Sequence, residues 1–287
     1  SILKHENKDI DIVVVGNGVD FAQAVAKNFN NDCTLSVFRN FGTAQIKFDD
    51  WIIEFIGARK ESYRRDSRKP MVENGTLEDD QNRRDFTINA MYLSLNSDHF
   101  GELYDPFNGV QDLQNGVIKT CNNPDVTFDD DPLRMLRGIR FASRLNFRIE
   151  LKTFEAIKRN VNRIEIVSQE RITDEVNAMI MAEKPSRAFD MMSKTGLLTL
   201  IFPELMALHG VETRNGKSHK DNFYHTLQVL DNICELTDNL WLRWAAILHD
   251  IAKPATKRFD NKVGWTFHGH EDKGSRMVKS IFKRMRL

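Results

Sequence analysis

The sequence predicts an α+β protein, with a mixed N-terminal part followed by an almost entirely helical remainder. Over roughly the first hundred residues, short apolar or alternating runs indicate strands around one helical segment. After about residue 120, apolar residues recur every three to four positions almost to the end, which is typical of amphipathic helices. A chain of 287 residues suits two or three domains better than one.

The mixed part begins with a predicted strand that runs into Gly16-Asn17-Gly18, where the glycines indicate a strand-to-helix turn. The expected strands are 10–15, 35–38, 44–48 and 51–56, and the expected helix is 19–28. The expected helices of the remainder are 131–145, 153–161, 169–182, 185–195, 222–236 and 241–251. Boundaries near Pro124 and in the polar connector Gly210 to Lys220 predict domains 1–120, 121–209 and 210–287.

Composition constrains the partners and the compartment. Basic and acidic residues number 41 each, so a nucleic-acid contact requires a local basic patch rather than a global field. Cys33, Cys121 and Cys234 are odd in number and in no metal or redox spacing, which favours reduced thiols. No apolar run approaches a membrane span, and the start lacks a signal pattern. We expect a cytoplasmic, soluble protein without a membrane partner, and the oligomeric state stays open.

Two strands carry acids that could hold a metal. Asp9 and Asp11 are two residues apart at the entrance of the first strand, so they share a face and can hold a divalent cation together. Glu54 lies in an otherwise apolar strand, where an unpaired carboxylate is costly to bury. Three such acids can bridge a pair of Mg²⁺ ions for phosphoryl transfer. The alternative interpretation is a solvated strand end.

The segment from Arg59 to Asp80 is predicted to be a long charged loop, either solvated or closing over a phosphate-bearing substrate. Its charged residues are Lys60, Arg64, Arg65, Arg68, Lys69, Glu73, Glu78, Asp79 and Asp80. Directly after this segment, Arg83 and Arg84 suit bidentate phosphate contacts, and a helix is expected to follow. Asp85 could cap that helix or bind a ribose hydroxyl, and Asn89, one turn later, can address the same pocket.

Three ordered motifs resemble those of the class II tRNA nucleotidyltransferase and poly(A) polymerase family. They are Arg83-Arg84-Asp85-Phe86-Thr87-Ile88-Asn89-Ala90, Asp105-Pro106-Phe107-Asn108-Gly109-Val110-Gln111-Asp112-Leu113 and Asp130-Asp131-Pro132-Leu133-Arg134-Met135-Leu136-Arg137. With Asp9 and Asp11 they cover residues 9 to about 205 in the family's order. The resemblance implies a polymerase-beta-type nucleotidyltransferase head, then a helical neck and body that hold the tRNA acceptor end.

The resemblance also implies site residues. Asp9 and Asp11 match the Mg²⁺-binding pair, and Glu54 matches the third acid. The positions that match contacts to the incoming CTP or ATP are Arg84, Asp85, Asn89, Asp131, Arg134 and Arg137.

Asp131 and Arg134 match the positions that read the base. At i and i+3 of a helix they would share a face, and Asp131 could accept from the exocyclic amine of C or A while Arg134 donates to a ring nitrogen. The alternative is a surface ion pair. Arg137, Arg140 and Arg144 extend a basic stripe toward phosphates.

A second resemblance, to the HD metal-dependent phosphohydrolase domain, begins at Tyr224-His225. It continues through His249-Asp250-Ile251-Ala252-Lys253 and reaches His268-Gly269-His270-Glu271. The implied ligands are His225, His249, Asp250 and His270, which suit Ni, Mn, Fe or Mg ions that activate water. Each histidine could instead be structural.

Departures from the family pattern concern both ends of the chain. The family's Gly-Gly-x-Val-Arg-Asp turn would precede Ser1, and the last HD aspartate would follow Leu287, so the chain is expected to be truncated at both ends. Lys119 stands where the family often has arginine.

The favoured function is template-independent addition of C and A to the tRNA 3′ end, with release of pyrophosphate. The long segment Arg59 to Asp80 resembles CCA-adding and A-adding enzymes better than CC-adding ones. The alternatives are a poly(A) polymerase, an HD phosphohydrolase acting on 2′,3′-cyclic phosphates or nucleotides, and a binding protein whose head has lost catalysis.

Overall fold

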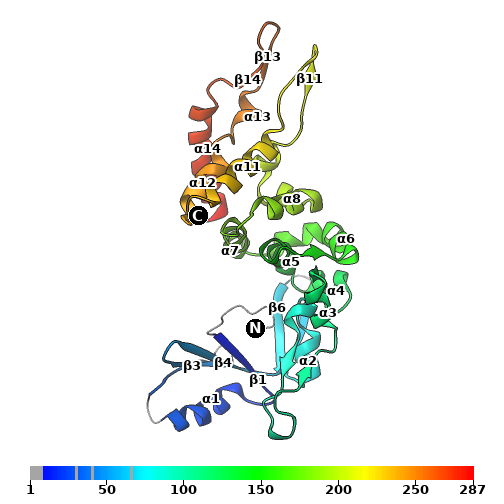
Figure 1. Ribbon diagram of the computed structural model, residues 1–287, viewed down its shortest axis with the longest axis vertical. Coiled ribbons are helices and arrows are strands. Elements are labelled where there is room, and N and C mark those ends of the chain that lie inside the picture. The colour runs from blue at the N-terminus through cyan, green and yellow to red at the C-terminus, as the bar shows by residue number, and fades with distance from the viewer. Residues whose placement is uncertain (1–8, 30–31, 40–41, 65–66) are drawn as a thin grey trace. The chain divides into compact units, whose positions relative to one another are not determined.

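The computed structural model describes residues 9–29, 32–39, 42–64 and 67–287 (Figure 1). Two compact units divide the chain between Arg84 and Asp85. No helix in the described ranges combines the length and the apolar character that crossing a membrane requires.

The first unit is built on a four-stranded mixed sheet in the order β1-β4-β3-β2. Its elements are β1 (Asp9–Val14), α1 (Gly18–Ala26), η1 (Lys27–Phe29), β2 (Thr34–Phe38), β3 (Thr43–Phe48) and β4 (Trp51–Gly57). β1 runs parallel to β4, whereas β4 with β3 and β3 with β2 are antiparallel. These strands and α1 agree with the predicted ranges to within two residues at each end.

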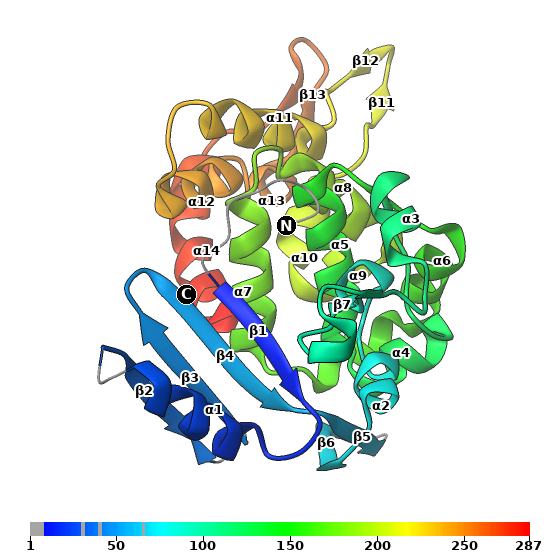
Figure 2. The ribbon, with the colours of Figure 1, turned by 60° about the horizontal axis from the view of Figure 1, so that its bottom comes forward.

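Helix α1 covers one face of this sheet (Figure 2). Ala22, Ala44, Ile46 and Phe55 form the buried core there. The turn from β1 to α1 is tight, because a Cβ at Gly18 would lie 2.8 Å from the backbone nitrogen of Gly57. The helix can therefore begin beside the end of β4 only with glycine at this position.

The prediction of a long loop from Arg59 to Asp80 is wrong. This segment forms an antiparallel hairpin of β5 (Arg59–Arg64) and β6 (Ser67–Asn74), followed by α2 (Leu77–Asn82). Lys60 lies opposite Glu73 in the register of this hairpin, so charged residues that suggested a solvated loop belong to paired strands. Of the basic residues named for that loop, Arg65 lies outside the described residues.

The second unit begins with short elements around the sequence motifs. They are η3 (Thr87–Asn89), β7 (Tyr92–Leu93), η4 (Ser97–His99), β8 (Leu103–Tyr104), α3 (Gly109–Gln114), β9 (Val117–Ile118) and α4 (Pro124–Asp130). β7 pairs with β8, and β9 pairs in parallel with β10 (Arg148–Ile149).

The rest of the second unit is mainly helical, as predicted. Its helices are α5 (Leu133–Leu145), α6 (Leu151–Asn160), η5 (Val161–Ile166), α7 (Gln169–Ile180), α8 (Ser186–Thr195), α9 (Leu197–Ile201), α10 (Pro203–Met206), α11 (Asn222–Cys234), α12 (Leu240–Leu248), α13 (Lys253–Thr256) and α14 (His270–Met285). One apolar core of buried side chains extends from Phe128 to Met285. The helices on both sides of residue 210 therefore share a core.

Polar contacts join these helices at their ends. The buried guanidinium of Arg243 in α12 donates to the carbonyl oxygens of Ile180 and Ala182, at 3.0 and 3.1 Å, and to that of Thr237 at 3.0 Å. Asp231 in α11 accepts from the backbone N–H of Ser186 at the start of α8. These bonds satisfy groups that the helix ends leave without an intrahelical partner.

Two hairpins in the last third were not predicted. They are formed by β11 (Thr213–Arg214) with β12 (Lys217–Ser218), and by β13 (Arg258–Asp260) with β14 (Gly264–Thr266). The first lies within the expected polar connector, and the second interrupts an otherwise helical run. Strands of two or three residues are too short to give a recognisable alternation.

Candidate functional sites

The register of β1 and β4 brings three carboxylates to one face of the sheet. Asp11 is the direct partner of Glu54, and Asp9 precedes Asp11 by two residues on the same strand. Gln45 on β3 is the other neighbour of Glu54. Since α1 packs against the alternating apolar side chains, these polar groups occupy the opposite face. Asp9 and Asp11 are exposed, and Glu54 is half-buried.

Carboxylate oxygens are the ligands that Mg²⁺ prefers, so this donor set suits a hard divalent cation. The three acids share a face but are not gathered into one compact group. Within the described ranges, the one group of three His, Cys, Asp or Glu residues whose ligand atoms all lie within 4.8 Å is elsewhere, at His225, His249 and Asp250. Carboxylates on one face repel each other, which favours this spacing.

Arg83 and Arg84 both donate to the buried carboxylate of Asp80. Arg83 Nε lies 2.8 Å from Oδ1, and Arg84 Nη2 lies 2.9 Å from Oδ2. Arg83 Nη1 also donates to Glu61 at 3.2 Å. The arginines predicted to bind phosphate are thus oriented by acids of their own unit.

Asp85 is buried and accepts hydrogen bonds from three residues, an arrangement that we call the Asp85 hub. Asp85 is not the N-cap of a helix, so the predicted cap is wrong. The segment after it forms only the 3₁₀ turn η3, whose N-cap residue is Phe86. Asp85 Oδ1 accepts from the backbone N–H of Phe86 at 2.8 Å and from Asn89 Nδ2 at 3.2 Å, while Oδ2 accepts from Arg137 Nε at 2.7 Å. Two residues predicted to bind nucleotide, Asn89 and Arg137, are therefore joined through a third, Asp85.

Phe86 fixes this hub against α5. Its ring is fully buried and meets Phe141 edge-on, with the ring centroids 6.0 Å apart. A Cβ on Gly138 would lie 2.9 Å from Phe86 Cζ, which is too close for an unshifted structure. Glycine within α5 therefore makes room for the phenylalanine of the first motif.

The second motif holds the first in place from the other side. A Cβ on Gly109 would lie 2.3 Å from the carbonyl oxygen of Thr87, and the Thr87 hydroxyl donates to Asp112 at 2.8 Å. Asp105 accepts from the backbone N–H groups of Gly109 and Val110 at 2.6 and 2.9 Å. From Asp85 onward, the first motif therefore packs with the second motif inside the second unit.

Asp131 and Arg134 do not lie on one helix, which corrects the predicted geometry. Asp131 has an extended backbone at the junction of α4 and α5, and its Oδ1 accepts from the N–H of Leu133 at 3.2 Å. Arg134 lies in the first turn of α5. The two remain sequence neighbours at the start of this helix, and both are half-buried.

The basic stripe on α5 is partly neutralised. Arg137 pairs with Asp85, and Arg140 Nε lies 2.6 Å from Glu175 Oε2. Both guanidinium groups lie over the ring of Phe141, at 5.2 and 4.5 Å from its centroid. Arg144 at the end of the helix is exposed.

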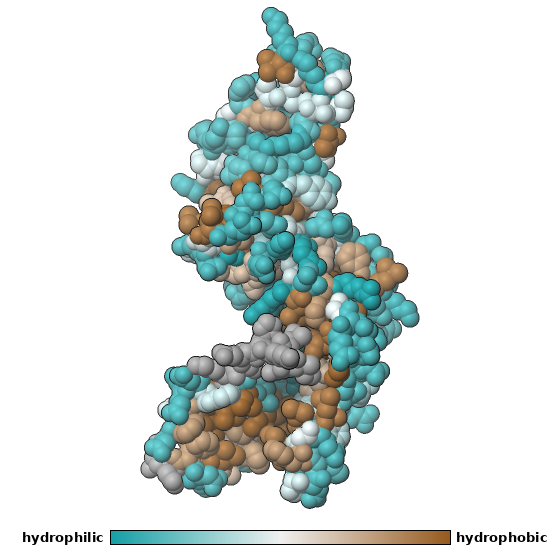
Figure 3. Space-filling view, in the orientation of Figure 1, coloured by the Kyte–Doolittle hydropathy of each residue, from teal (hydrophilic) through white to brown (hydrophobic). Residues whose placement is uncertain are grey.

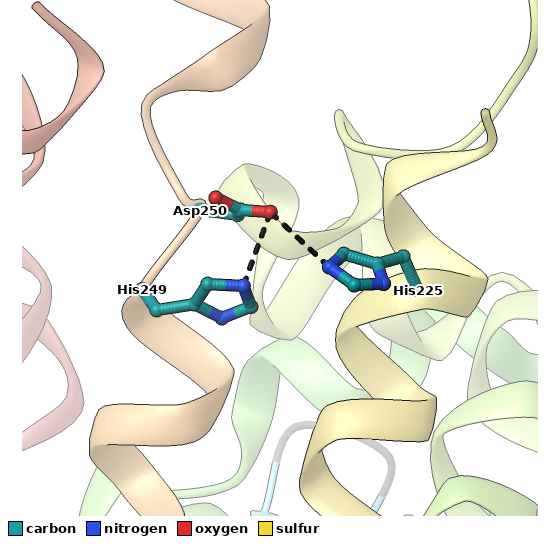
Figure 4. Close-up of side chains that lie close together, drawn as sticks. All are labelled: His225, His249 and Asp250. Carbon is teal, nitrogen blue, oxygen red and sulfur yellow. Dashed lines mark ion pairs between the residues drawn. The ribbon is translucent and has the colours of Figure 1, made fainter. Parts of the chain in front are cut away.

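A second candidate site lies where α11 and α12 approach each other (Figure 4). His225 projects from α11, His249 caps the end of α12, and Asp250 follows directly. Nε2 of His249 and Nε2 of His225 lie 3.1 and 3.9 Å from Asp250 Oδ2. Two imidazoles and a carboxylate facing a common point are a typical ligand set for a divalent transition metal.

His270 and Lys253 also face Asp250. His270 Nε2 lies 3.5 Å from Oδ1 but outside the compact group of three, whereas Lys253 Nζ lies 2.6 Å from Oδ2. The Nδ1 atoms of His249 and His270 lie 2.7 and 2.8 Å from backbone carbonyl oxygens, which leaves both Nε2 atoms toward the acid.

These contacts shift the protonation equilibria of the cluster. Burial alone would raise the pKa of Asp250, but hydrogen bonds from His249 and Lys253 outweigh it and hold the pKa below its usual value. The hydrogen bond to Asp250 raises the pKa of His249. Burial, with Lys220 nearby, lowers the pKa of His225, which favours the neutral imidazole that binds metals.

Comparison with known families matches three successive parts of the chain. The poly(A) polymerase head domain matches residues 1–119, the probable RNA and SrmB-binding site of polymerase A matches 146–208, and the HD domain matches 222–287. A multifunctional CCA protein of Shewanella frigidimarina is 32% identical over the whole of this chain and 67% of its own length. The chain belongs to the tRNA nucleotidyltransferase and poly(A) polymerase family.

Other relatives of this family are A-adding tRNA nucleotidyltransferases. Those of Aquifex aeolicus and Deinococcus radiodurans are 41% and 34% identical over 56% and 74% of this chain. The chain spans 19% and 49% of their lengths, so it corresponds to half or less of these proteins.

Solved structures of the family agree with this assignment. A CCA-adding enzyme of Thermotoga maritima complexed with tRNA is 25% identical over 100% of this chain and 59% of its own, with a TM-score of 0.69. A tRNA nucleotidyltransferase complexed with a primer tRNA and an incoming ATP analog is 26% identical over 98% of this chain and 77% of its own, with a TM-score of 0.65.

Four residues in or next to the motifs, to which sequence reasoning assigned no role, hold the first motif in position. Gly109 and Gly138 allow close approach to Thr87 and Phe86, and Asp105 and Asp112 anchor the second motif. An isolated glycine within the α5 pattern was the available signal, because such a residue often marks a packing constraint.

Proposed function

We propose that this chain carries the catalytic residues of a tRNA nucleotidyltransferase that adds C and A to the tRNA 3′ end from CTP and ATP. The observation that carries the proposal is the pairing of Asp11 with Glu54 on the face that also bears Asp9. Membership of the family supports nucleotidyl transfer as the type of reaction. The relatives named as A-adding tRNA nucleotidyltransferase and multifunctional CCA protein support tRNA as the acceptor.

Asp9, Asp11 and Glu54 would hold the divalent cations. Bound there, Mg²⁺ would supply positive charge beside the attacking 3′ hydroxyl and the leaving pyrophosphate. The protein's part is to fix the acids on a rigid sheet, with Gln45 beside Glu54 able to orient that carboxylate by hydrogen bonding.

In the second unit, the Asp85 hub would orient the nucleotide. Asp85 holds the Asn89 amide and the Arg137 guanidinium in fixed directions, so Asn89 can bond a ribose hydroxyl and Arg137 a phosphate oxygen. Asp131 and Arg134 would read the Watson–Crick edge of the base, where C and A both present an amine donor and a ring-nitrogen acceptor. G and U present the opposite polarity at those positions.

The decisive test is incorporation of labelled CTP and ATP with Mg²⁺ into tRNA transcripts that end at the discriminator base, at C and at CC. Ordered addition on all three indicates a CCA-adding enzyme, and addition of A only to the CC end indicates an A-adding enzyme. Long A tracts on unrelated RNA would instead indicate a poly(A) polymerase. The variant Asp11→Asn should reduce incorporation to background, whereas Asp20→Asn, an exposed acid of the same unit, should not. Activity that survived Asp11→Asn would contradict the metal assignment.

The proposed reading of the base by Arg134 in α5 has a separate test. Replacing Arg134 by alanine should reduce the preference for C and A over U and G by about tenfold to a hundredfold, which corresponds to about 1–3 kcal/mol for a lost bidentate contact. Arg144→Ala, an exposed position on the same helix, is the control. Unchanged selectivity in Arg134→Ala would mean that this arginine is structural.

A second proposed function is hydrolysis of phosphoesters at the HD cluster, and it rests on the geometry of His225, His249 and Asp250. These side chains would hold a divalent metal such as Ni²⁺, Mn²⁺ or Mg²⁺, which supplies a nucleophilic water. Release of phosphate from a 2′,3′-cyclic phosphodiester, measured with each metal in turn, tests it. His225→Gln should abolish release while nucleotide incorporation persists, and Asp11→Asn should have the reverse effect.

A further inference from the structure

The two hairpins of the last third lie side by side in both ribbon views (Figures 1 and 2). We call residues 211–220 and 257–268, which contain them, the hairpin platform. Trp265 Nε1 donates to the carbonyl oxygen of Lys217 at 3.1 Å, and Lys217 Nζ donates to that of Lys262 at 2.5 Å. Lys257 adds an ion pair with Glu212 at 2.5 Å. These cross-links fix hairpins whose strands are too short to be stable alone.

The hairpin platform is strongly basic in a chain whose net charge is zero. It contains six lysines and arginines but only two carboxylates, and its outer end is mostly hydrophilic (Figure 3). One acid, Glu212, pairs with Lys257, and the other, Asp260, accepts from the backbone N–H groups of its own turn. Among the residues that the structure describes, Arg214, Arg258 and Lys262 are exposed and have no carboxylate within ion-pair distance. Their charge is available to an external anion.

Two cations of the hairpin platform, Arg214 and Lys257, lie over aromatic rings. The Arg214 guanidinium lies 4.9 Å from the centroid of Phe259, and Lys257 Nζ lies 4.7 Å from that of Trp265. The two rings meet edge to face with their centroids 5.2 Å apart. Cations interleaved with aromatic rings are the usual features of surfaces that bind single-stranded nucleic acid, because phosphates and bases are contacted together.

The hairpin platform is continuous with the HD cluster. One hairpin directly precedes α11, which carries His225, and the other lies between Asp250 and His270 in the sequence. Phe267, where the platform meets α14, lies under the Lys253 ammonium at 5.7 Å, and that ammonium also binds Asp250. The base of the hairpin platform therefore adjoins the candidate metal ligands.

We propose that the hairpin platform binds the phosphate backbone of a single-stranded RNA segment next to the HD cluster. An anionic membrane fits less well, because the exposed large apolar side chains of the platform are only Val211 and Val263 among the described residues. The binding is independent of both proposed activities, since it is measured without turnover.

The test is fluorescence anisotropy of a labelled single-stranded RNA oligonucleotide, titrated with the full chain at several salt concentrations without nucleotide or added metal. The variant Arg214→Glu with Lys262→Glu removes two predicted phosphate contacts. We expect the slope of log affinity against log salt to fall by about 1.4, at roughly 0.7 per contact, and the affinity near 0.1 M salt to fall about 25-fold. The matched control, Lys279→Glu with Lys283→Glu, makes the same charge change at exposed positions of α14 and should stay within about twofold of wild type.

Three results would overturn the proposal. An unchanged salt slope in the platform variant would exclude phosphate contacts there. Equal losses in the platform and control variants would mean that net charge alone governs binding. Binding to vesicles of phosphatidylglycerol that exceeds RNA binding and is lost in the same variant would assign the surface to membranes. If the glutamates disturb folding, as judged by circular dichroism, Arg214→Gln with Lys262→Gln should still reduce the salt slope.

Discussion

The contact between Gly138 and Phe86 yields a quantitative prediction for Gly138→Ala. In an open helix, alanine in place of glycine stabilises by about 0.5–1 kcal/mol. Here the new methyl would lie 2.9 Å from Cζ and 3.3 Å from Cε1 of a fully buried ring that Phe141 restrains. Overpacking of this kind costs about 1–3 kcal/mol. We therefore expect a net loss of about 1–2 kcal/mol and a shift of the adjoining Asp85 hub.

Gly274→Ala in α14 is the matched control, because its new methyl would meet only ordinary contacts at 3.7 and 3.8 Å. It should stabilise the protein by about 0.5–1 kcal/mol. Urea unfolding followed by tryptophan fluorescence in a Trp51→Phe background reports the second unit alone, since the three remaining tryptophans lie there. Combining Gly138→Ala with Phe86→Leu should remove most of the overpacking cost. Equal stabilisation by both alanines would refute the steric argument.

Three further predictions concern stability. Arg243→Met should lower the free energy of unfolding in urea by about 3 kcal/mol or more, because buried carbonyl oxygens at the ends of α7 and α11 lose their donor. The control is Asp238→Asn, which alters the exposed ion-pair partner of Arg243 and should change stability by less than about 1 kcal/mol. Asp231→Ala should lower the free energy of unfolding by about 1–2 kcal/mol through loss of the cap on α8, and Asp231→Asn, which keeps an acceptor, should recover part of it. The hydrogen bond from Arg159 holds the pKa of Asp125 below its usual 3.8, so this carboxylate stabilises the fold above pH 3.8 and the effect is lost as the pH falls through the lowered pKa. The difference in Tm between wild type and Asp125→Asn should accordingly be largest near pH 6 and shrink toward pH 3; a difference that grew in acid would contradict the assignment.

The helices of the expected ranges could be predicted because each carries its own periodicity, whereas α14 (His270–Met285) was not among them. The expected range 131–145 corresponds to α5, in which the residues between the half-buried Arg134, Arg137 and Arg140 are buried. The hairpin of β5 and β6 was missed for the opposite reason. The pairing of Lys60 with Glu73 is a non-local contact, and in the sequence the two residues indicate only a charged stretch.

The candidate sites were predictable in residue type but not in arrangement. The spacing of Asp9 and Asp11 already places them on one face of a strand, and the register with β4 adds Glu54. Nothing in the sequence indicates that Asp85 bonds Arg137 across 52 positions, since that contact depends on how η3 packs on α5. For the same reason, the prediction that Asp131 and Arg134 lie on one helix is wrong, because the chain is extended at Asp131 between α4 and α5.

The parallel pairing of β1 with β4 also has a consequence for biosynthesis. Parallel neighbours cannot be joined by a tight turn, and here α1, β2 and β3 lie between them in the chain. Asp11 therefore meets Glu54 only after β4 has emerged from the ribosome and inserted between β1 and β3, a late step of high contact order. In a nascent or partly folded first unit, Asp11 would be present without Glu54 beside it, so the acidic face that we propose to hold metal ions forms only when the sheet is complete.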